Sequence, residues 1–138
     1  MREISLSISP GFAMVPKPSR QDRLDALTKI CLALPETRRE DKGSHAAFLV
    51  GQKTFAYYLD NHHGDNIVSV CCKVLPDENH FLVESSPARF YLPAYIGPRG
   101  WIGLRMDLPK LNWSEVKELI RGSYLQLAPK RLASLVDR

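Results

Sequence analysis

With 138 residues, 44% of them hydrophobic, the chain is long enough to bury one core and too short for two ordinary domains. No apolar run approaches the ~20 residues that span a bilayer, and the N-terminus lacks a basic-then-apolar signal pattern, so we expect a cytoplasmic protein without a membrane segment. The formal net charge of +4 at pH 7 is spread toward both ends of the chain, which is more typical of a solvated surface than of a nucleic-acid footprint.

The first residues carry no helical period. We predict that residues 1–18 form a flexible N-terminal tail, because prolines interrupt their short apolar alternation. The folded domain is expected to span residues 19–138. On the same grounds, Met14 is an alternative start of the chain.

The first helix has a clear beginning. Ser19 followed three residues later by Asp22 is a helix-capping pattern, and apolar residues recur at helical spacing until Pro35. These signals predict a helix over residues 20–34 with its apolar stripe on a core. The charged stretch 36–42 is too polar for a central strand, and we interpret it as an edge strand.

Strands dominate the middle of the chain. Two β-rich runs, 47–50 and 53–59, are separated by Gly51-Gln52, as in a tight hairpin. A polar turn then precedes a third run, 67–74. Together these runs predict an antiparallel meander.

A short helix is predicted after the meander. Pro76 and the two acidic residues that follow it open a helical stretch that continues through Ser85. The next apolar stretch is expected to be irregular because it contains Pro93.

The stretch Gly97–Met106 carries the densest pattern of the chain. Its glycines and proline supply a tight reversal, and its period-two alternation predicts a strand with one apolar face and one mixed face. The apolar face holds Ile102, Leu104 and Met106, and the mixed face holds Trp101, Gly103 and Arg105.

The chain closes with helices. Asn112 with Glu115 predicts the start of a long helix, whose apolar stripe includes Leu119 and which Pro129 ends; a short helix over 130–136 follows. The elements together predict an α+β single domain. Its antiparallel sheet of about five strands is flanked by an N-terminal helix, a short middle helix and C-terminal helices.

No catalytic or metal-binding pattern stands out. Asp60, His62, His63 and Asp65 lie close together in the sequence, but adjacent histidines in a turn diverge, so an exposed pair without a metal is the favoured interpretation. The three cysteines lack CxxC spacing and are predicted to be buried free thiols. We therefore expect no catalytic residue, no metal and no cofactor.

Three stretches of the chain stand out together by their order and spacing. They are Gly43–Ala56, Gly97–Leu104, and Ser123-Tyr124 with Ala128–Leu132. Over about residues 20–138 they resemble the MmcQ/YjbR family, although Ala46 stands where relatives commonly have proline. The resemblance implies an antiparallel sheet flanked by helices, similar to the type III secretion chaperone architecture. Members of that family are labelled as predicted DNA-binding proteins, and the resemblance implies no catalytic residues.

One possible strand register would create a nucleic-acid-binding face, with cations for phosphates and rings for base stacking. This register aligns Lys53, Phe55 and Tyr57 with Ser69, Cys71 and Lys73 and with Trp101 and Arg105. The candidate contacts are Lys53, Lys73, Arg99, Trp101, Arg105, Arg38, Arg39 and Lys42. The alternative is that a helix covers this face and its rings are core, because a one-residue register change reverses the assignment.

Two functions of different classes stay open. The first is a non-catalytic module that binds DNA or other nucleic acid weakly and without sequence preference. The second is a protein-interaction or chaperone-like module, self-associating or bound to another protein, with no nucleic-acid role. A contiguous basic patch around Arg99 and Arg105 favours the first, and an exposed apolar patch on a symmetric contact favours the second. Neither function needs a membrane.

Overall fold

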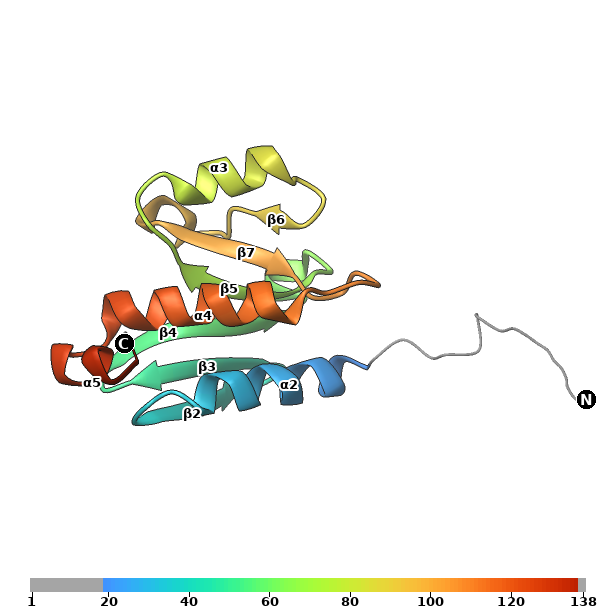
Figure 1. The fold of residues 1–138 in the computed structure, drawn as a ribbon. Helices are drawn as coiled ribbons and strands as arrows, with labels where there is room; N and C mark the ends of the chain where they lie inside the picture. Colours follow the sequence, from blue (N-terminus) through green and yellow to red (C-terminus); the bar gives the residue numbers. More distant parts are fainter. Residues whose placement is uncertain (1–18, 137–138) are drawn as a thin grey trace, which may run out of the picture.

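The computed structural model describes residues 19–136. The tail predicted for residues 1–18, with Met14 inside it, lies outside the described residues. Within the described part, helices and one antiparallel sheet form an α+β fold, as predicted (Figure 1).

Six strands form one open sheet in the order β2-β3-β4-β5-β7-β6, with every neighbouring pair antiparallel. The strands are β2 (Thr37–Lys42), β3 (His45–Val50), β4 (Lys53–Asp60), β5 (Val68–Lys73), β6 (Phe90–Tyr91) and β7 (Trp101–Arg105). The predicted meander of β3, β4 and β5 is confirmed, and so is the charged edge strand β2. β6 was not predicted, because a strand of two residues is too short to show alternation.

Residues 19–136 contain four α-helices, all of them near their predicted positions. They are α2 (Arg20–Leu32), α3 (Glu78–Ser85), α4 (Trp113–Leu127) and α5 (Lys130–Val136). Both predicted N-caps are present: Ser19 Oγ accepts the N–H of Asp22 at 3.0 Å, and Asn112 Oδ1 accepts the N–H of Glu115 at 3.2 Å. None of the helices in this part of the chain is long and apolar enough to cross a membrane.

The main core lies between the sheet and two helices. α2 and α4 lie side by side across one face of the sheet (Figure 1). The predicted apolar face contributes to this core, because Ile102 and Leu104 of β7 and Met106 just after it are each at most 1% exposed. They pack in one cluster with Val116 and Ile120 of α4.

A loop covers part of the opposite face of the sheet. Ile96, just before the short 3-10 helix η3 (Gly97–Arg99), packs against a buried cluster that includes Trp101 and Cys71. The sequence left open whether this face of the sheet is exposed or covered, and the structure shows that it is covered over β5 and β7. The cover is formed by the loop that returns over β7 after β6, with Leu127 at the end of α4 packed beside it.

The packing of β6 against β7 depends on a glycine. A Cβ added at Gly103 would lie 2.4 Å from Cε1 of Tyr91, far inside any real contact distance. The hydroxyl of Tyr91 is hydrogen-bonded to Ser69 Oγ at 2.6 Å, which fixes the ring over the strand. The tyrosine ring can lie there only because residue 103 has no side chain.

We expect Gly103→Ala to lower the free energy of unfolding by about 1–3 kcal/mol, because the Tyr91 ring must move and weaken its hydrogen bond to Ser69. Urea denaturation followed by circular dichroism measures this loss. In a Tyr91→Ala background the same glycine substitution should cost little, since the clash is already gone. Equal losses in both backgrounds would contradict the proposed contact.

Candidate functional site

Across β5 and β7 the candidate face has the predicted alignment. Ser69 lies opposite Arg105, and Lys73 lies opposite Trp101. Trp101 is nevertheless only 8% exposed, and its ring lies 5.5 Å from that of Tyr57. A nucleic-acid base has no access to a ring covered in this way, so the geometry makes Trp101 a core residue.

β4 departs from the predicted alternation. A β-bulge interrupts its register with β3. Phe55 lies on the helix side of the sheet, fully buried, with its ring 5.5 Å from that of Tyr124. The predicted row of Lys53, Phe55 and Tyr57 on one face is therefore wrong, because the extra residue of a bulge reverses the direction of the side chains. Lys53 itself is exposed at the start of β4.

Three of the candidate arginines are already paired with carboxylates. The pairs are Arg38 with Glu40 (3.2 Å), Arg39 with Asp41 (2.6 Å) and Arg105 with Asp107 (3.0 Å). The hydrogen bonds that the guanidinium groups donate to Asp41 and Asp107 raise the pKa of Arg39 and of Arg105. Each of the three arginines must exchange its present partner before it can bind a phosphate.

Arg99 and Arg105 do not form the contiguous basic patch that would favour the nucleic-acid module. Arg99 precedes β7 and Arg105 ends it. The extended residues of β7 alone separate the two ends of this strand by about 13 Å. Lys42, opposite His45 where β2 meets β3, lies at the same end of the sheet as Arg105.

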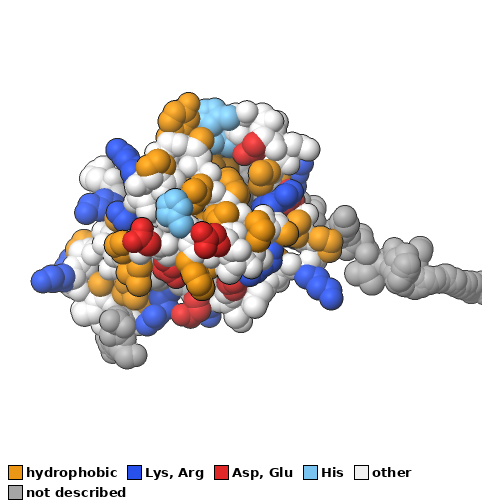
Figure 2. All heavy atoms as spheres, turned by 90° about the horizontal axis from the view of Figure 1, so that it is seen from above, with side chains coloured by type: hydrophobic (Ala, Val, Ile, Leu, Met, Phe, Trp, Pro, Cys, Tyr) orange, Lys and Arg blue, Asp and Glu red, His pale blue; other side chains and the backbone are white. Residues whose placement is uncertain are grey.

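Lys53, Lys73 and Arg99 lie at the other end of the sheet, which we call the basic end. β4 begins at Lys53, β5 ends at Lys73, and Arg99 precedes the first residue of β7 by one glycine. None of the three forms an ion pair within residues 19–136. This end is at the left of Figure 1, and Figure 2 shows Lys and Arg side chains on the same side of the molecule. The opposite end carries the carboxylates of Asp41, Asp60 and Asp107.

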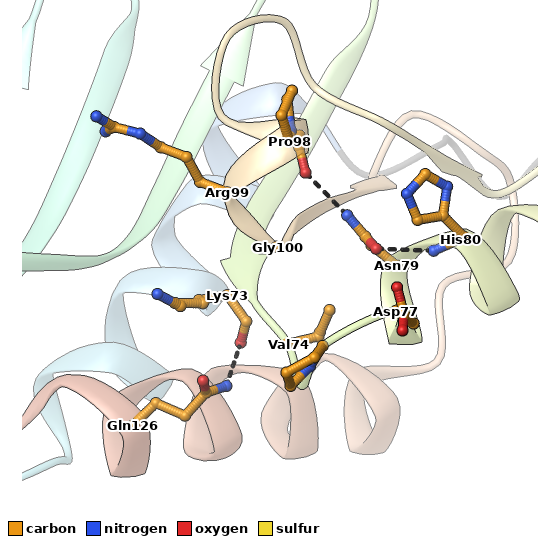
Figure 3. Close-up of a pocket in the computed structure, with 11 residues that line it drawn as sticks. Lys73, Val74, Asp77, Asn79, His80, Pro98, Arg99, Gly100 and Gln126 are labelled. Carbon is orange, nitrogen blue, oxygen red and sulfur yellow. Dashed lines mark hydrogen bonds between the residues drawn. The ribbon is translucent and has the colours of Figure 1, made fainter.

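A hollow of about 500 Å3 opens beside Lys73 and Arg99. Its other walls include Asp77 and His80 at the start of α3, Pro98 of η3 and Gln126 of α4. Figure 3 shows the two cationic side chains extending to one side, with Asp77 and His80 on the other. The hollow therefore brings together segments that are far apart in the sequence.

Hydrogen bonds of buried polar side chains connect the walls of the hollow. Asn79, only 2% exposed, donates to the carbonyl oxygens of Gly97 (2.9 Å) and Trp101 (3.2 Å), which ties α3 to η3 and β7. Ser123 of α4 accepts the N–H of Lys73 at 3.0 Å and donates to a carbonyl of β4 at 2.7 Å. Because these groups are buried and satisfied, the walls have little freedom to shift.

The YjbR family model matches residues 32–126, more than half of the chain. The chain belongs to the YjbR family. The matched range contains the whole basic end of this YjbR chain and the residues that line the hollow.

A solved structure shares the fold of this YjbR chain. It is the crystal structure of protein DR2400 from Deinococcus radiodurans, described with the family-model domain DUF419. The TM-score is 0.65 at 19% sequence identity, over 87% of this chain and 91% of that one. At this identity the likeness shows the fold alone. No curated protein matches the sequence.

Sequence reasoning missed the residues of the YjbR domain that share the hollow with Lys73 and Arg99. Asp77, His80 and Gln126 reach it from α3 and α4, and no spacing rule connects them to β5 or η3. The one available signal was the proline followed by acidic residues at the start of α3. It indicated a helix terminus but not what the terminus faces.

Three histidines of this YjbR domain, His45, His62 and His63, gather away from the hollow, whereas His80 lines it. The ring centroids of His45 and His62 lie 5.3 Å apart, and those of His62 and His63 lie 4.0 Å apart. Burial, and then the two neighbouring rings, lower the pKa of His62. Residues 19–136 hold no group of three or more His, Cys, Asp or Glu side chains able to bind a metal.

The cysteines are buried and free, as predicted. Burial raises the pKa of Cys71 to about 11, so its thiol is neutral at pH 7. A neutral buried thiol is a poor nucleophile, and Cys71 is best understood as part of the packing beneath the loop cover.

Proposed function

We propose that this YjbR-family chain is a non-catalytic module that binds nucleic acid weakly and without sequence preference through its basic end. The observation that carries the proposal is that Lys53, Lys73 and Arg99 share one end of the sheet without an ion pair among the described residues. Unpaired cations are free to neutralise phosphates. Such contacts between cations and phosphates supply essentially all of the affinity in non-specific nucleic-acid binding. The DNA-binding label of the family points in the same direction.

The shape of the basic end favours contact with the backbone over recognition of bases in a duplex. Recognition in the major groove usually uses a helix or a two-stranded ribbon that enters the groove. Here the cations stand on the ends of two neighbouring strands, β4 and β5, and on the turn of η3. Contacts to phosphates alone explain weak and sequence-tolerant binding.

The salt dependence of binding tests this proposal. With about three phosphate contacts, the slope of log affinity against log salt on duplex DNA is expected to be about −3, and Lys73→Ala or Arg99→Ala should each reduce it by about one unit. Fluorescence anisotropy of a labelled mixed-sequence duplex at increasing KCl measures the slope. Lys29→Ala, an exposed lysine on α2, is the matched control and should leave the slope unchanged. Failure of any nucleic acid to bind at low salt would rule the proposal out.

A protein-interaction module is the second candidate, supported by apolar side chains near α3. Phe81 is 66% exposed and Leu75 is 62% exposed. Leu75 also borders a groove with Leu119 and Leu125 of α4. Size-exclusion chromatography of the same sample separates the two candidates, since self-association without nucleic-acid binding would favour the interaction module.

A further inference from the structure

We propose that the hollow beside Lys73 and Arg99 accepts one unstacked nucleotide, with its phosphate at the two cations and its base inside. This inference rests on the proposed function, because the same cations serve both. It goes further by naming a single nucleotide as the bound unit. This nucleotide is either part of a single strand or free in solution.

The two sides of the hollow differ in chemistry. Lys73 and Arg99 extend to one side, and Asp77 and His80 lie opposite them (Figure 3). None of these four side chains has a hydrogen bond or ion pair within residues 19–136, whereas buried Asn79 has its amide fully engaged. A ligand with an anion at one end and hydrogen-bond donors at the other end fits this polarity.

The size of the hollow suits such a ligand. Its volume of about 500 Å3 lies within the range of about 300–1,000 Å3 that is usual for small-molecule sites. The His80 ring and Pro98 offer flat surfaces against which a base can lie. A paired base in a duplex would have to leave its stack to enter, so single strands should have an advantage.

The hydrogen-bond acceptors of the hollow, Asp77 opposite the cations and Gln126 beside Lys73, indicate which bases fit (Figure 3). The Asp77 carboxylate only accepts hydrogen bonds at neutral pH. Gln126 donates through Nε2 to the carbonyl of Lys73 at 3.2 Å, which leaves its own carbonyl oxygen as an acceptor. Adenine and cytosine present an exocyclic amine donor, whereas thymine presents a carbonyl at the corresponding position. We therefore expect the hollow to favour adenine and cytosine over thymine.

Homopolymer binding tests this inference. Labelled oligo(dA), oligo(dC) and oligo(dT) of equal length are titrated beside a mixed duplex, and the first two should bind at least about fivefold more tightly than oligo(dT). Asp77→Asn should abolish this preference, because the amide also donates. Asn tolerates the left-handed backbone of residue 77, where φ is 67°. Glu118→Gln removes one carboxylate outside the hollow and should leave the preference intact.

Competition distinguishes a free nucleotide from a nucleotide in a strand. Adenosine monophosphate should displace oligo(dA) in the wild type and do so less well in Asp77→Asn. Inorganic phosphate at the same concentration should displace less, because it lacks the base. Equal displacement by phosphate and adenosine monophosphate would overturn the nucleotide site.

The remaining outcomes separate this inference from the proposed function. Equal homopolymer affinities that Asp77→Asn does not change, with salt-dependent duplex binding retained, would overturn the nucleotide site and leave the proposed function standing. No binding of any polymer, with adenosine monophosphate still bound through Asp77, would overturn the proposed function and assign the hollow to free nucleotides. Absence of both kinds of binding would overturn both.

Discussion

Trp101→Ala is expected to lower the free energy of unfolding by about 3–5 kcal/mol, as truncation of a buried aromatic side chain usually does. The ring packs against Tyr57 and belongs to the buried cluster under the loop cover, together with Leu59 and Cys71. Its removal leaves a cavity between the sheet and the loop that carries η3. Urea denaturation followed by circular dichroism measures the loss.

Trp101→Phe is the matched variant, because it keeps a ring in the same place. It should cost less stability than the alanine variant and leave single-strand affinity at the wild-type level, since the tryptophan ring is covered. A Trp101→Ala protein that keeps its stability but loses single-strand affinity would show that the ring stacks on bases. That result would restore the sequence-based interpretation of Trp101 as a nucleic-acid contact.

Leu104→Ala is expected to cost about 2–5 kcal/mol, because it truncates a fully buried side chain at the centre of the main core. Leu104 lies between Val70 of β5 and Phe90 of β6 in the sheet, on the face that α4 covers. Few neighbours there can move to fill the space, since backbone hydrogen bonds hold the strands on both sides. The denaturation midpoint reports the change.

Leu119→Ala is the comparison for this core substitution. The helical stripe of the sequence placed Leu119 with the core residues, but in the structure it is only half-buried and borders the groove beside Leu75. Its truncation should therefore cost clearly less than that of Leu104, because partly exposed side chains lose less burial and leave no closed cavity. Similar losses for both would mean that the groove is filled in solution.

Ion pairing decides which cations of this chain can meet a phosphate. The net charge of +4 treats all basic residues alike, yet Arg38, Arg39 and Arg105 each have a carboxylate two positions further along the chain. Residues two apart on a strand point to the same face, so these pairs were visible in the sequence once strands were assigned. The candidate contacts were chosen by the type of charge, and the pairing of each arginine with a nearby carboxylate was not considered.

The sequence by itself determined the features that depend on residues close together in the chain. The caps at Ser19 and Asn112, the charged edge strand and the two faces of β7 were all predicted from spacing. Capping involves atoms three residues apart, and strand alternation follows from the backbone alone. Such local rules hold whatever the rest of the chain does.

The tertiary structure alone decided which surfaces are free. The loop that covers Trp101, the bulge that turns Phe55 toward α4 and the hollow between Lys73 and Asp77 all join segments that no periodicity connects. A one-residue change of register or a loop that returns over a strand moves a side chain between core and solvent without changing the local pattern. For that reason the sequence predicted the elements of the candidate site, while only the packing showed that Lys53, Lys73 and Arg99 stay available and Trp101 does not.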